Sequence, residues 1–273
     1  MSALEPDRAR PGARTAGSSD RAFLVAVALA FVAASAATVH WCTAMTGDMP
    51  MPGGWTLSMI WMPMPGQPWL GAAAGFLGMW MVMMVAMMQP SLVAMLWDYR
   101  RALRTRATPG TGVMTAVAGA AYFTVWLGVG FVALGLGTEV AAVAMRSPEM
   151  ARLAPFAAGV ALLLAGAFQI SGFKVRQLAR CRDARACGLA LTAGAAGAWR
   201  DGLRFGARCS LCCAGLMAVL LLGGMMRLTT VVVVAAAITV ERLAPWPALA
   251  ARAAGLLVVA AGTLTLARAA GLI

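Results

Sequence analysis

Residues 69–97, WLGAAAGFLGMWMVMMVAMMQPSLVAMLW, decide the fold class of this chain. The stretch contains no charged side chain and is longer than the roughly 20 apolar residues that a helix needs to cross a bilayer. The rest of the sequence has the same character, because 61% of its 273 residues are apolar and only 12% are charged. Soluble domains have about 25% charged residues. We therefore predict an all-α, polytopic transmembrane helix bundle.

Further apolar segments follow the same pattern, and we expect about seven membrane-spanning helices in all. The segment at 228–240 is short and rich in valine, and Glu241 and Arg242 directly after it mark an exit to water. The expected spans are residues 22–39, 69–97, 113–137, 155–172, 209–226, 228–240 and 249–266.

The basic residues predict the orientation of these spans, because cytoplasmic loops near span ends carry an excess of Lys and Arg. With the N-terminus in the cytoplasm, eighteen of the 22 basic residues fall in inner segments; the outer ones are Arg146, Arg152, Arg227 and Arg268. The net charge of +12 is thus a topology signal, and we expect the basic residues to meet anionic lipid and not nucleic acid. The sequence predicts a multi-pass protein of the bacterial inner membrane.

The segments outside the spans differ in composition. Residues 1–21 are polar and lack hydrophobic periodicity, which predicts a disordered basic cytoplasmic tail before a transmembrane domain at 22–273. Within that domain we expect a Met-rich outer loop at 40–68, extended because it holds five prolines, and a basic cytoplasmic loop at 173–208. A signal peptide is the alternative for 22–39. Its apolar run of 18 residues exceeds the roughly 7–15 of a signal core and favours an uncleaved anchor.

The outer loop contains the first candidate metal site. Imidazole, thiol and thioether groups follow one another where the first span meets water, and soft sulfur ligands suit Cu(I). The same loop could instead lie on lipid headgroups, with its tryptophans as interfacial anchors. The sequence leaves both interpretations open, because no fixed ligand spacing of the zinc type occurs. The candidate ligands are His40, Cys42, Met45, Met49 and Met51.

The start of the fifth span contains the second candidate site. Cys209, Cys212 and Cys213 are spaced i, i+3 and i+4, so they share one face of a helix, and Met217 extends that face by one turn. Three thiols and a thioether could hold Cu(I). The alternative is that these small apolar side chains only let helices pack closely.

The methionines of residues 69–97 are a third constellation. A helix turns by about 100° per residue, which divides these methionines into two groups on different sides of the helix. Their sulfur atoms therefore do not form one continuous row. Packing explains this spread at least as well as a metal conduit does. Gln89 and Pro90 mark a break or kink, and the spacings Gly71–Gly75 and Gly202–Gly206 allow close helix contact. The two groups are Met81, Met84, Met88 and Met95, and Met79, Met83 and Met87.

Several short motifs occur in one order along nearly the whole chain. They are MWMVMMVAMM at 79–88 with Pro90, Trp126-Leu127-Gly128, Gln169 with Lys174, Trp199-Arg200, Cys209 with Cys212-Cys213, Leu216-Met217, Gly223-Gly224, Met226 and Glu241. With these motifs the chain resembles a bacterial family described as predicted metal-binding integral membrane proteins, some members of which are labelled copper chaperones. The resemblance implies a helical membrane fold and metal handling.

The chain departs from that family pattern near the expected ligands. After the fourth span the pattern has two cysteines four residues apart, whereas here Gln177 takes the first place and Cys181 keeps the second. Phe205 stands where the family has a histidine, Ala214 where it has an aromatic residue, and Arg227 where it has an asparagine. The resemblance thereby adds Cys181 to the candidate ligands.

Together these features favour an integral membrane protein that binds or passes on a soft metal. A copper ion is the expected cargo, captured by the outer methionines and held by the inner thiols, and a copper-delivering or copper-accepting protein is the expected partner. The alternative is a non-metal scaffold or assembly subunit in which Met and Cys only pack helices.

Other classes find no support in the sequence. We do not expect an enzyme, because the chain has one histidine and no phosphate-binding Gly-Lys-Ser/Thr run. It also lacks the polar path and internal repeats of a secondary transporter. Five of the six cysteines fall on the predicted reducing side, so no disulfide framework is expected.

Overall fold

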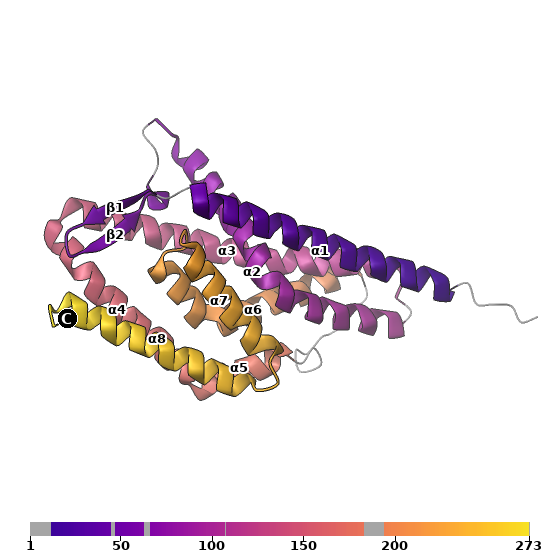
Figure 1. The fold of residues 1–273 in the computed structure, drawn as a ribbon. Coiled ribbons are helices and arrows are strands. Elements are labelled where there is room, and N and C mark those ends of the chain that lie inside the picture. Colours follow the sequence, from indigo (N-terminus) through magenta and orange to yellow (C-terminus); the bar gives the residue numbers. More distant parts are fainter. Residues whose placement is uncertain (1–11, 45–46, 63–65, 107, 183–193, 273) are drawn as a thin grey trace, which may run out of the picture.

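The computed structural model describes residues 12–44, 47–62, 66–106, 108–182 and 194–272, which form a helical bundle with one small hairpin (Figure 1). The helices are α1 (Gly12–Ala44), α2 (Trp69–Thr105), α3 (Thr111–Arg146), α4 (Pro148–Ile170), α5 (Gly172–Arg182), α6 (Ala195–Gly223), α7 (Leu228–Leu243) and α8 (Pro247–Ala269). The hairpin strands are β1 (Asp48–Met51) and β2 (Trp55–Ser58), followed by the 3-10 helix η1 (Met59–Trp61).

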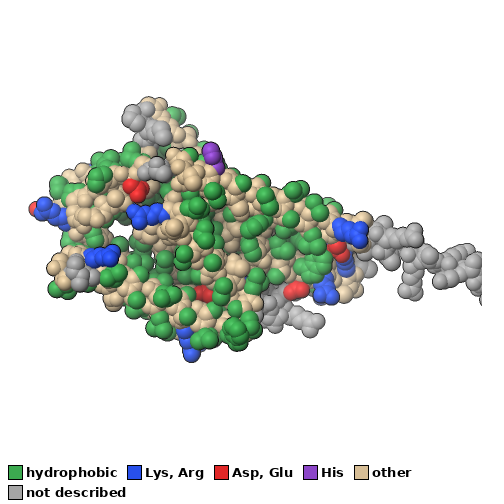
Figure 2. Space-filling view, viewed as in Figure 1, with side chains coloured by type: hydrophobic (Ala, Val, Ile, Leu, Met, Phe, Trp, Pro, Cys, Tyr) green, Lys and Arg blue, Asp and Glu red, His purple; other side chains and the backbone are tan. Residues whose placement is uncertain are grey.

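The predicted all-α transmembrane bundle is confirmed, and a helix occurs at each of the seven expected spans. Six of these helices in the described ranges are long and apolar enough to cross a membrane. The exception is α7, which has 16 residues. In Figure 1 the long helices run side by side between two ends of the bundle, which we name the hairpin end and the α5 end. Hydrophobic side chains cover much of the face in Figure 2.

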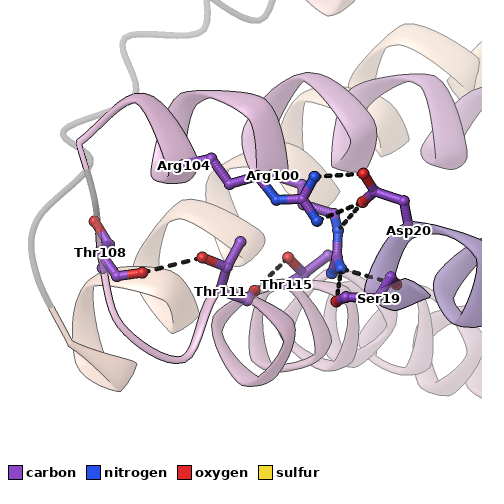
Figure 3. Close-up of polar contacts among 7 residues, drawn as sticks. All are labelled: Ser19, Asp20, Arg100, Arg104, Thr108, Thr111 and Thr115. Atoms are coloured by element: carbon purple, nitrogen blue, oxygen red, sulfur yellow. Dashed lines mark hydrogen bonds and ion pairs between the residues drawn. The ribbon is translucent and has the colours of Figure 1, made fainter. Parts of the chain in front are cut away.

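The first helix begins earlier than expected. Residues 12–21 were predicted to belong to a disordered tail, but they form the start of α1, while residues 1–11 lie outside the described part of the chain. An ion cluster with α2 holds this start in place (Figure 3). Arg100 donates from Nε to Asp20 Oδ1 at 3.0 Å, and Arg104 also pairs with Asp20. Because this carboxylate is matched by two cations on the neighbouring helix, the polar segment stays helical.

The outer loop is also more structured than expected. The first helix continues to Ala44, and β1 then pairs with β2 in antiparallel register, with Met51 opposite Trp55. Trp55 donates from Nε1 to the carbonyl of Ala151 at 2.8 Å, which ties the hairpin to the start of α4. The loop is therefore a folded cover over the ends of α3 and α4. Its prolines exclude a continuous helix, but they do not prevent a short hairpin.

The long helix α2 supplies more of the main core than any other helix. Its methionines at 79, 83, 84, 87, 88 and 95 are all buried, and Met81 is half-buried. Both predicted methionine faces are covered because α2 packs against α1, α3 and α7. The helix continues across Pro90, and Gln89 beside it donates from Nε2 to the carbonyl of Val27 in α1.

Glycines set the spacing of two helix pairs. A Cβ atom on Gly206 would lie 2.8 Å from the carbonyl oxygen of Tyr122, and one on Gly202 would overlap Ala118, so α6 touches the α3 backbone. Gly166 in α4 makes a similar close approach to α8. The predicted contact role of Gly202 and Gly206 is confirmed. For Gly75 the same expectation is wrong within this chain, because nothing lies within 4 Å of its Cβ position.

We predict that Gly206→Val destabilises the fold by about 1–3 kcal/mol, because the added methyl groups must push α6 away from α3. The midpoint of thermal unfolding in detergent, followed by circular dichroism, measures this. Gly75→Val is the matched control, since it makes the same change in helix propensity at a position with open space around the added side chain. Equal shifts for the two variants would contradict the close α3–α6 contact.

Candidate metal-binding site

Four thiols from two helices form the candidate site, and we name them the thiol cluster: Cys181, Cys209, Cys212 and Cys213. The three on α6 are 1–2% exposed, and Cys181, at the end of α5, is half-buried. Cys181 packs in one small cluster with Cys212, and Cys209 and Cys213 both contact the guanidinium of Arg242. The structure therefore brings together the second group of predicted ligands and the cysteine that the family resemblance added.

The helical spacing of α6 explains why its three cysteines lie close together, and it also places them on two neighbouring faces of the helix. Cys209, Cys213 and Met217 follow one another at i, i+4 and i+8 and are buried in the main core. Cys212 lies one position off that line and packs instead with Leu178 of α5. The predicted single stripe is thus two adjacent faces of one helix. The thiols lie where these two faces meet.

A buried arginine contacts two of the thiols. Arg242, on α7, donates from one terminal nitrogen to Cys209 Sγ at 3.0 Å and to Cys213 Sγ at 3.5 Å. The hydroxyl of Tyr122 on α3 lies 3.0 Å from the same Cys209 sulfur. Three helices therefore meet at Cys209. The thiolate is the form of cysteine that binds metals, and a guanidinium that contacts two sulfurs is placed to balance its negative charge.

An ion pair lies next to the cluster. Lys174 of α5 is fully buried, pairs with Glu241 Oε2 of α7 at 2.7 Å, and also donates to the carbonyl oxygen of Cys212. Gln169 of α4 donates to the other carboxylate oxygen of Glu241. We expected Glu241 and Arg242 to mark an exit to water, and that expectation is wrong. Both are buried, because each has polar partners inside the bundle.

A small cavity leads to the cluster. Its volume is about 50 Å³, which exceeds the space a water molecule or bare ion needs. Cys181 and Arg242 line one part of it, and Met95 and Asp98 of α2 line another. Asp98 is exposed. The cavity thus brings an exposed carboxylate of α2, the Cys181 thiol and the Arg242 side chain around one space.

The structure does not gather the first group of candidate ligands. His40 and Cys42 are two positions apart on α1, so their side chains point to different sides. The imidazole is exposed, as the purple side chain in Figure 2 shows, while Cys42 is buried in the main core. Met51 is buried in a separate cluster with Leu57, and Met45 lies outside the described residues.

The cluster is not a preformed cage. Among the residues described, no three His, Cys, Asp or Glu side chains are placed to hold one metal ion together. A soft monovalent ion such as Cu(I) needs fewer ligands than such a cage supplies, and it prefers sulfur. The arrangement therefore fits a site that takes up and gives away a sulfur-bound ion better than a permanent structural metal site.

Sequence reasoning missed the polar partners of the cluster. The sequence pattern places three ionisable residues at span ends or in motifs without a stated role: Arg242, Glu241 and Lys174. In the structure they lie around the thiols. The available signal was that ionisable residues next to or inside membrane spans are functional by default. The hydroxyl of Tyr122 gave no such signal, because an aromatic residue in an apolar helix looks like packing.

We predict that an alkylating reagent modifies Cys181 before the three α6 cysteines in the folded protein. Cys181 lines the cavity, and the hydrogen bond from Cys212 lowers the pKa of its thiol despite the opposing effect of burial. Peptide mass spectrometry after brief treatment with N-ethylmaleimide measures the order of labelling. Faster labelling of Cys212 would contradict the placement of α5 over α6.

We also predict that Lys174→Met costs about 3–5 kcal/mol of stability, because it leaves the buried Glu241 carboxylate without its cation. The double variant Lys174→Met/Glu241→Gln removes both charges and should recover much of that loss. Thermal unfolding of the wild type and the two variants in detergent tests this. A double variant that is no more stable than the single one would show that the ion pair is not the cause.

Comparison with known proteins adds one result. The model of a family described as PpoB2, copper chaperone, matches residues 77–265, which include the thiol cluster, Arg242 and the buried methionines of α2. The hairpin and the end of α1, with the outer candidate ligands, lie before the matched region. No curated protein and no solved structure matches the chain.

Proposed function

The chain belongs to the PpoB2 copper chaperone family, and we propose that it handles Cu(I) in a membrane through its thiol cluster. Its six long apolar helices support a multi-pass membrane protein. The family name supports copper as the cargo. We further propose the bacterial inner membrane as its location, with the α5 end facing the cytoplasm, because most basic residues lie toward that end.

The polar contacts of the buried α6 thiols are the observation that carries this proposal. Cysteines that serve only as small apolar residues have no need to contact a buried arginine and a tyrosine hydroxyl. Cys209 and Cys213 are the proposed principal ligands. They lie one helical turn apart, and Arg242 contacts both sulfurs. Cys212 and Met217 are the proposed auxiliary ligands on the same helix.

The cavity beside Arg242 is the proposed route for the ion. Asp98, Met95 and Cys181 all line it, so a carboxylate, a thioether and a thiol face one space. The last two groups are soft ligands for Cu(I). Cys181 would then be the first thiol to meet the ion. A copper-delivering or copper-accepting protein would dock at this end of the bundle.

The outer residues have a smaller part in this proposal. His40 and Cys42 point apart, and Met51 is packed under the hairpin. Capture of copper by this loop would need the hairpin to open. We therefore place the binding site in the matched region, at the inner thiols, and treat the hairpin as a cover.

A copper-loading experiment tests the proposal. The purified protein is loaded anaerobically with Cu(I) in detergent, desalted and analysed for copper per chain. The Cys209→Ser/Cys212→Ser/Cys213→Ser variant should lose most of the copper that the wild type retains. Cys42→Ser is the matched control, because it removes another buried thiol near the hairpin end of α1, and it should retain copper.

Two outcomes would contradict this function. Equal copper in the wild type and the triple variant would exclude the thiol cluster as the site. Copper binding by neither the wild type nor the control would favour the alternative, a membrane scaffold in which the sulfur side chains only pack helices. The buried methionines of α2 agree with that alternative, since Met fills irregular spaces in a core.

A further inference from the structure

The electrostatic setting of Arg242 is unusual for a buried cation. The side chain is 8% exposed, yet the described residues contain no ion pair between it and a carboxylate. Its Nε has no hydrogen-bond partner in the same part of the chain. Its hydrogen bonds go to the sulfurs of Cys209 and Cys213, which are weak acceptors when protonated. A buried charge left in this way is costly unless an anion faces it.

Among the described residues no neighbouring carboxylate pairs with Arg242. Asp98 lines the same cavity but is exposed, so water screens its charge. Lys174 and Glu241 neutralise each other at 2.7 Å. Asp20 pairs with Arg100 and Arg104, far along the chain at the start of α1. The groups that can supply negative charge to Arg242 are therefore the thiols that it contacts. They do so when they lose their protons.

Charge counting at the cluster then depends on which ion binds. When Cu(I) binds two thiols, two protons leave and the bis-thiolate complex keeps one net negative charge, which Arg242 balances. When a divalent ion such as Zn(II) binds the same two thiolates, the complex is neutral. Arg242 then faces the same net charge as it faced with two protonated thiols, so zinc binding gains no stabilisation from the guanidinium, whereas Cu(I) binding does.

We propose that Arg242 is a specificity-determining residue, which makes the thiol cluster selective for a monovalent soft cation over divalent ions. This inference rests on the proposed function, because it assigns the metal's charge at the same site. Arg242 acts by balancing the charge of the complex and need not touch the metal. Its position at two sulfurs also orients Cys209 and Cys213 toward one another before the ion arrives.

Measured affinities for the two ions test the proposal. The wild type, Arg242→Gln and Arg242→Lys are titrated with Cu(I) against bathocuproine disulfonate, and with Zn(II) against a chromogenic zinc chelator. We expect Arg242→Gln to weaken Cu(I) binding at least about tenfold, because the anionic copper complex loses its counter-ion, and to leave Zn(II) binding nearly unchanged, because the zinc complex is as neutral as the two protonated thiols that it replaces. Arg242→Lys keeps the charge and should keep the wild-type preference.

The controls separate this proposal from the function on which it rests. If the wild type does not bind Cu(I), the proposed function fails. If the wild type binds Cu(I) but Arg242→Gln changes both affinities in the same direction, or neither, the charge-selection proposal is overturned and the copper site stands. Arg242→Met serves as a second neutral variant of similar length if Arg242→Gln does not fold. Circular dichroism before titration establishes folding.

Discussion

The Lys174–Glu241 ion pair is the interaction on which the rest of the structure depends. It joins α5 to α7 directly, reaches α4 through Gln169, and reaches α6 through the carbonyl oxygen of Cys212. In an apolar bundle, every buried polar group must find its partner inside the protein. These contacts therefore leave few alternative registers for the four helices. The thiols are held beside this polar centre because their own helix is one of the four.

The sequence predicted the helices and the proximity of the α6 cysteines, for identifiable reasons. Long apolar runs have few alternatives in a membrane, and cysteines at i, i+3 and i+4 must lie near one another on any helix. The partners of those cysteines could not be obtained in the same way. Arg242 follows the cluster by about thirty positions in the chain and reaches it only because α7 folds back along α6.

In the outer loop, residues that are close in sequence are separated by the fold. His40, Cys42 and Met51 are close in sequence and have suitable ligand chemistry, but sequence proximity does not set direction. The helix α1 continues past the expected end of its span and turns His40 and Cys42 to different sides. Hairpin packing against α3 and α4 then buries Met51. Tertiary packing, which no local pattern reports, thus separates residues that looked like one site.

The short length of α7 has a consequence for the surrounding lipid. A helix of 16 residues spans about 24 Å, which is less than the roughly 30 Å hydrocarbon thickness of a bilayer. The turn between α6 and α7 carries Arg227, whose side chain is 61% exposed. Arg227 pairs with Asp48 of the hairpin at 3.8 Å, so the polar group that ends this short helix is held at the hairpin end, and we expect the bilayer to become thinner beside α7 to meet it. The protein would then favour thin membranes, and its lipid surroundings would differ from one flank to the other.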